Sequence, residues 1–170
     1  IKSASDFDEA NSKFNTIFRD ISKSANQTAQ DLSNSFGLSS SQALELLGNT
    51  GDLLTGFGFT QKEALGLSEQ VNQLAVDLAS FTNFSGGASG ASEALTKALL
   101  GERESIKSLG IAITEADLKR FAEEQGLVFK ELDRVAKAQL TFELAVSQSQ
   151  KAIGDFARTQ GGFANQLRIL

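Results

Sequence analysis

The feature that most restricts the fold is the absence of proline from a chain of 170 residues. Proline breaks helix interiors, and this chain is instead rich in Ala, Leu, Gln, Glu and Lys, which favour helix. Its 15 glycines are then the main interruptions between helices. We therefore expect an all-α fold of amphipathic helices joined at glycines and arranged as helical hairpins or a bundle.

Capping signals and glycines divide the chain into expected helices. Helix starts are predicted where a Ser or Thr is followed three residues later by Asp, Gln or Glu, at Ser5/Asp8, Ser39/Gln42, Thr60/Glu63 and Thr114/Asp117. Helix ends are predicted at glycines 37, 48, 101, 110 and 126. Residues 85–92 are expected to form a flexible loop and residues 111–114 a connector. The resulting segments are an N-terminal amphipathic helix (1–36), a glycine-jointed region of short helices (37–126) and a long C-terminal helix that leads into a rod (127–170).

Two stretches repeat apolar residues in steps of three and four, the spacing of a helix seam. The first seam contains Leu67, Val71, Leu74, Leu78 and Phe81, and the second contains Leu132, Val135, Phe142, Val146, Ile153 and Phe156. Such seams pack against a facing helix, either in the same chain or in another copy. We expect helix packing at these positions and a coiled-coil trimer or hexamer as the oligomeric form.

Composition excludes several kinds of chemistry. The chain has no His, Cys, Met, Trp or Tyr, so imidazole bases, thiol nucleophiles and the usual ligands of zinc are absent. Up to residue 85 there are 5 basic and 10 acidic residues, and beyond it 11 of each, which argues against a nucleic-acid partner. No apolar run approaches the roughly 18 residues of a membrane span, so we expect a soluble chain without catalytic, cofactor or metal sites.

The stretch TGDLLTGFGFTQKEA (residues 50–64) resembles a phosphate-binding loop only superficially. Gly51 and Gly56 have the spacing of the loop's glycines, but Phe57 and Gly58 occupy the places of the essential Lys and Ser/Thr. We interpret the stretch as a joint between helices. The neighbouring carboxylates at 102/104 and 123/124 are interpreted as solvated helix surface, because residues one or two apart do not share a helix face.

All 13 aromatic residues are phenylalanines, and most of them lie on the apolar stripes. Binding surfaces favour Tyr and Trp for their polar groups, so core packing is the main expectation. Four phenylalanines at segment ends are assigned as candidate partner contacts: Phe57, Phe59, Phe84 and Phe163.

Three stretches resemble phage tail tape measure proteins. They are LTGFGFTQKEALGLSEQVNQLAVDLASFTNFSGG (54–87), ALLGERESIKSLGIAITEADL (98–118) and KAQLTFELAVSQSQKAIGDFARTQGGFANQLRIL (137–170). In the third, GDFART followed by ANQLR is especially similar to the block that leads into the family's helical rod. The resemblance covers residues 47–170 in one consistent order, whereas residues 1–46 match only in helical character. Since these proteins run for many hundreds of residues and this chain begins with Ile1, we expect an internal fragment.

The resemblance implies a structural virion protein of the phage or prophage tail. A tape measure protein lies in the lumen of the tail tube or at the tail tip, sets tail length during assembly and is released at DNA ejection. The implied partners are further copies of itself, the tail tube protein, the tail tip or baseplate hub proteins and the tail assembly chaperones. It would be in the host cytoplasm during assembly and in the virion afterwards, with membrane contact restricted to ejection. The glycine joints favour a folded helical head over a stretched ruler.

Three alternatives remain open at this point. The runner-up is a non-viral helical adaptor or secretion-assembly protein. An enzyme acting on cell walls is a third class, although no residue matches the His- or Cys-based sites of embedded peptidoglycan hydrolases. A membrane-penetrating segment is the fourth, but the amphipathic stripes lack the Lys/Arg-rich polar face of interfacial helices. The sequence therefore favours a structural role in the tail over an enzymatic one.

Overall fold

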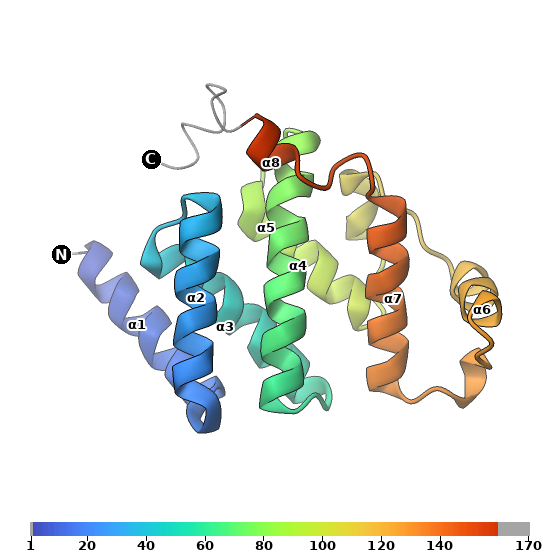
Figure 1. Ribbon diagram of the computed structural model, residues 1–170, viewed down its shortest axis with the longest axis horizontal. Coiled ribbons are helices and arrows are strands. Elements are labelled where there is room, and N and C mark those ends of the chain that lie inside the picture. Colours follow the sequence, from blue (N-terminus) through green and yellow to red (C-terminus); the bar gives the residue numbers. More distant parts are fainter. Residues whose placement is uncertain (1, 160–170) are drawn as a thin grey trace. The chain divides into compact units, whose positions relative to one another are not determined.

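The computed structural model describes residues 2–159, with side chains from residue 4 onward, and this part of the chain is all-α, without a strand. Figure 1 draws its helices, and its contacts divide it into two units. The first unit contains the residues up to Gln73 together with the segment from Phe156, and the second runs from Leu74 to Asp155. The described helices include none with both the length and the apolar character needed to cross a bilayer.

The first 36 residues form three elements instead of one helix. These are α1 (Lys2–Ile17), the short 3₁₀ helix η1 (Arg19–Ile21) and α2 (Ser22–Phe36). Helix α1 already contains Ser5, so the expected capping box does not mark its start. The helix is interrupted at Phe18, whose backbone (φ −107°, ψ 29°) is non-helical. The interruption lets α1 and α2 both pack against α3 (Ser40–Phe57), which one straight helix could not do.

Helix α2 ends as expected at Gly37, which is left-handed (φ 62°) and donates its backbone N–H to the carbonyl of Ser33. The capping box that opens α3 is also confirmed, because the side chains of Ser39 and Gln42 bond reciprocally to the backbone. The predicted end of this helix at Gly48 is wrong, since α3 continues to Phe57. Gly48 lies against Phe14 of α1, so this glycine serves helix packing and not termination.

Helix α4 (Gln61–Phe81) begins at the predicted capping box. Thr60 accepts a hydrogen bond from the N–H of Glu63 at 3.2 Å, and Glu63 accepts one from the N–H of Thr60 at 3.0 Å. The helix is continuous across the boundary between the two units. It therefore contributes its first half to one core and its second half to the other.

The second unit is built from helices that pack around α7. Its remaining elements are α5 (Gly87–Leu99), η2 (Ser105–Leu109), α6 (Glu115–Glu124), η3 (Phe129–Glu131) and α7 (Arg134–Gln148), followed at the boundary by α8 (Asp155–Arg158). Helices α5 and α6 both pack against α7. The predicted capping box of Thr114 and Asp117 starts α6, and the residues before it form the expected connector.

The uninterrupted helix expected from residue 127 is not formed. Asp133 caps a helix that starts only at residue 134, and this helix ends at Gln148. A series of turns follows, with a left-handed Gly154 (φ 83°) before α8. Capping by Asp133 explains where the helix starts. At its other end the C-cap Ser149 already has a non-helical backbone (φ −108°, ψ 12°), and Gly154 makes the last turn before α8. The expected continuation into a rod beyond residue 159, including Phe163, lies outside the described residues.

Candidate functional site

The glycine-rich stretch at residues 51–59 serves helix packing and a turn. Gly51 lies inside α3, where a Cβ atom would be 2.4 Å from Cζ of Phe18. The turn itself comes at Gly58 (φ 124°), and the following Phe59 is buried. The preference for a helix joint over a phosphate loop agrees with this geometry, but the joint is at Gly58 and not at Gly51 or Gly56.

The loop expected at residues 85–92 is wrong for most of its length, because α5 already begins at Gly87. The ring of Phe84 explains why glycines are needed at this helix start. A Cβ on Gly86 would be 2.8 Å from Cε1 of Phe84, and one on Gly90 would be 3.0 Å from the same atom. The small residues therefore make room for an aromatic ring, which covers the first turn of the helix.

The first seam lies largely in the interior. Leu67, Val71, Leu74 and Leu78 are buried, whereas Phe81 is 50% exposed. Burial within a single chain accounts for these four residues without a second copy. The expected trimer or hexamer thus stays a prediction.

The second seam is less regular. Phe142 and Phe156 are buried, Leu132, Val135 and Val146 are half-buried, and Ile153 is 39% exposed. The buried residues of α7 are Ala138, Leu140, Thr141, Phe142, Leu144 and Ala145. Since α7 packs against both α5 and α6, small and large side chains are buried on more than one side of the helix, and not along a single large-residue seam.

The candidate partner phenylalanines have different environments. Phe59 is buried and Phe57 is half-buried at the end of α3. Phe84 is half-buried over its two glycines, and Phe163 is outside the described residues. None of the described three is among the strongly exposed apolar side chains, which include Phe7, Phe81 and Val128.

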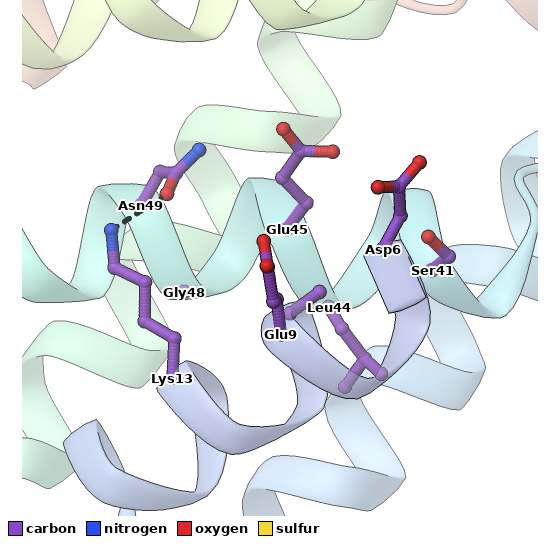
Figure 2. Close-up of a pocket in the computed structure, with 9 residues that line it drawn as sticks. Asp6, Glu9, Lys13, Ser41, Leu44, Glu45, Gly48 and Asn49 are labelled. Carbon is purple, nitrogen blue, oxygen red and sulfur yellow. Dashed lines mark hydrogen bonds between the residues drawn. The ribbon is translucent and has the colours of Figure 1, made fainter. Parts of the chain in front are cut away.

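A groove with a volume of about 420 Å³ lies between α1 and α3 (Figure 2). Lys13 donates to Oδ1 of Asn49 at 2.8 Å and forms an ion pair with Asp52 at 3.4 Å. Figure 2 shows two carboxylates of α1 and that of Glu45 on α3 pointing to the same side, with no hydrogen bond or ion pair to other described residues. Among the described residues no group of three Asp or Glu side chains could hold a metal ion. These carboxylates are solvated surface charges.

A second groove, of about 470 Å³, lies where α1 and α2 approach each other over α3. Three amide side chains of α2 line it at intervals of four residues, namely Asn26, Gln30 and Asn34. Residues four apart lie on one side of a helix, so this spacing was a readable signal. Neither the apolar periodicity nor the capping signals reveal this row of amides.

Two small polar clusters are buried. In the first unit, Asn72 donates through Nδ2 to the carbonyl of Ser68 at 2.8 Å and to Oγ1 of Thr50 at 3.2 Å. In the second, Asp77 accepts a hydrogen bond from the N–H of Gly154 at 2.8 Å. The apolar pattern of α4 does not predict the contacts with Thr50 and Gly154, since these partners lie 22 and 77 residues away.

The pKa shifts resolved for the described residues belong to exposed caps and ion pairs. Hydrogen bonds from the backbone and side chain of Thr114 lower the pKa of Asp117, with a further contribution from Arg120. A hydrogen bond between Glu93 and Lys97 lowers the pKa of the first and raises that of the second. Catalytic groups are usually shifted by burial in a cleft, so these shifts have a structural cause.

The chain was compared with family models, curated proteins and solved structures. No family model matches it, and neither a curated protein nor a solved structure does.

Proposed function

We propose that this chain is a portion of a phage or prophage tail tape measure protein, with a structural and not an enzymatic role. The observation that carries the proposal is the ordered resemblance of residues 54–87, 98–118 and 137–170 to that family. These stretches correspond to α4, to the segment from the end of α5 into α6, and to α7 with α8. Helices α1 and α2 have no counterpart in the resemblance.

The fold supports an organising role better than a stretched one. In the first unit α1 and α2 pack on α3, and in the second α5 and α6 pack on α7. Helices that pack side by side do not add their lengths. Within the proposed function, this portion is therefore a folded head that organises assembly at the tail tip together with the tail tube, tip and chaperone proteins.

The direct test is made in the phage or prophage that encodes the chain. A stop codon is placed early in its coding sequence, and a plasmid copy of the full gene restores it as the control. We expect peptides of the chain in purified virions by mass spectrometry, and the mutant should assemble no tails or tails of irregular length. Tails of normal number and length in the mutant, or virions lacking the peptides, would reject the proposal and favour the non-viral adaptor.

A second experiment distinguishes a head from a ruler. An in-frame deletion of about 14 residues from α7 removes about 21 Å of helix, and tail lengths are measured by negative-stain microscopy. Because α7 is the centre of the second unit, we expect either no tails or tails of unchanged length. Tails shortened by about 21 Å, and lengthened by the same step when the block is doubled, would show that this portion is part of the ruler.

A further inference from the structure

We propose that the groove between α1 and α2 binds a neutral, hydroxyl-rich ligand, most simply a short oligosaccharide. This inference goes beyond the proposed function and does not depend on it. We call the site the amide groove and define it by Phe7, Asn11, Asn26, Gln30, Ser33 and Asn34. Its volume of about 470 Å³ falls in the range of small-molecule sites.

The hydrogen-bonding chemistry of the groove suits a ligand rich in hydroxyl groups. Asn26, Gln30 and Asn34 repeat every four residues along α2, a rise of about 6 Å per step. The side chains of Gln30 and Asn34 have no hydrogen bond to other described residues, and Asn26 uses only its Nδ2 group, toward the carbonyl of Ser22 at 2.8 Å. Each amide can donate and accept at once, which matches a row of hydroxyl groups.

The charge of the groove suits a neutral ligand. Among the described residues that line it, Lys23 is the single charged one. The neighbouring groove between α1 and α3 differs, because Asp6, Glu9 and Glu45 line it. An anionic ligand would need more cations and a cationic ligand would need carboxylates, so the amide groove favours a neutral ligand.

The apolar side chains of the groove favour a sugar over a partner helix as its ligand. A docking helix gains its free energy by burying apolar side chains, but Ala29 and Leu44 at the base of the groove are already buried in the chain. Phe7 is the apolar side chain left open, with 39% of its surface exposed. One exposed aromatic ring beside a row of amides can cover the apolar face of a sugar ring while the amides bond its hydroxyls.

The test uses the whole 170-residue chain, isotope-labelled for NMR, and three neutral probes: maltotriose, cellotriose and N,N′,N″-triacetylchitotriose. We expect at least one probe to shift the side-chain amide signals of Gln30 and Asn34 and the ring signals of Phe7 in a saturable way, with a weak dissociation constant of about 1 mM. The double variant Gln30→Ala/Asn34→Ala should bind about tenfold more weakly, because two hydrogen bonds are lost. Phe7→Leu should also weaken binding while keeping the helix apolar.

The matched control is Gln70→Ala, which removes an exposed amide of α4 outside the groove and should leave binding unchanged. Far-UV circular dichroism confirms that each variant is folded. The proposal is overturned if none of the probes shifts these signals, if the shifts occur outside the groove, or if the double variant binds as well as the unmodified chain. Amide shifts that depend on protein concentration without sugar would also overturn it, since they would show that another copy occupies the groove.

Discussion

The contact between Gly51 and Phe18 predicts that alanine substitution affects stability differently at two glycines of α3, Gly51 and Gly56. A Cβ at residue 51 would meet Cζ of Phe18 at 2.4 Å and Cε2 at 3.0 Å. Phe18 is fully buried, and its ring packs edge-on against Phe14 with centroids 5.1 Å apart. At Gly56, also in α3, a Cβ would meet nothing within 4 Å. The change Gly51→Ala therefore pushes on a packed ring, whereas Gly56→Ala does not.

The magnitudes follow from two terms. Alanine is better than glycine in a helix interior by about 1 kcal/mol; Gly51→Ala gains this term in full, and Gly56→Ala, in the last turn of α3, gains part of it. Overpacking a core costs about 1–3 kcal/mol, and this cost falls on Gly51→Ala alone. We expect Gly56→Ala to raise the free energy of unfolding by up to about 1 kcal/mol. Gly51→Ala should be less stable than Gly56→Ala by about 1–3 kcal/mol, which makes it neutral to destabilising overall.

The assay is urea unfolding followed by far-UV circular dichroism, with the two units fitted separately if two transitions are seen. Phe18→Leu supplies the internal check, because it replaces the ring that Gly51→Ala would displace with a shorter side chain. In that background Gly51→Ala should lose most of its penalty, with a coupling free energy of about 1 kcal/mol or more. If Gly51→Ala and Gly56→Ala stabilise the chain equally, the ring moves aside freely and the packing argument is refuted.

Three further predictions concern the second unit. The side chain of Gln148 accepts a hydrogen bond from the N–H of Ala112 at 3.1 Å and donates one to its carbonyl at 3.0 Å. Gln148→Ala should therefore lower the free energy of unfolding by about 1–2 kcal/mol and speed hydrogen exchange at the N–H of residue 112. Unchanged exchange there would contradict this. Asp117→Asn should be less stable than the unmodified chain at neutral pH. Because the pKa of folded Asp117 is lowered, this difference in stability should vanish as the pH falls below 3.8 and then through the folded pKa. A difference that persists in acid would exclude the charge as its cause. Phe84→Ala should cost about 1–3 kcal/mol, below the range for a fully buried ring, and increase hydrogen exchange in the first turn of α5 from Gly87; an unaltered exchange pattern there would show that the ring does not hold the helix start.

Local signals in the sequence predicted much of the fold. Three capping boxes, the left-handed Gly37 and the connector before Thr114 are where the sequence places them. These features depend on residues within a few positions of each other, so their chemistry is visible in a short window. The break at Phe18 is different, because it forms where α1 has to turn to let two helices pack on α3.

The glycines show why the remaining elements could not be predicted. Gly37 and Gly110 have positive φ angles and end helical elements, as expected. Gly51 and Gly90 lie inside helices under phenylalanine rings. Phe18 is 33 positions from Gly51, so nothing near that glycine in the sequence distinguishes a helix end from a packing contact. Long-range packing decides between the two uses of glycine.

The candidate grooves illustrate a related limit. Four-residue spacing of Asn26, Gln30 and Asn34 is readable from the sequence, but it indicates only that these amides share a helix side. Their role depends on α1 lying opposite, which places Phe7 and Asn11 in the same groove. That arrangement requires the interruption at Phe18, which the apolar stripe did not reveal.

The packing of the second unit also limits what this portion could contribute to a ruler. Helices α5, α6 and α7 contain 13, 10 and 15 residues, which would extend about 57 Å if they followed one another in a straight line. Because α5 and α6 both pack against α7, their rises do not add, and the longest of the three spans about 22 Å. A tape measure that keeps this fold in the particle must therefore take its length from other parts of the chain. Within the proposed function, deletions in this portion should then change whether tails assemble and not how long they are.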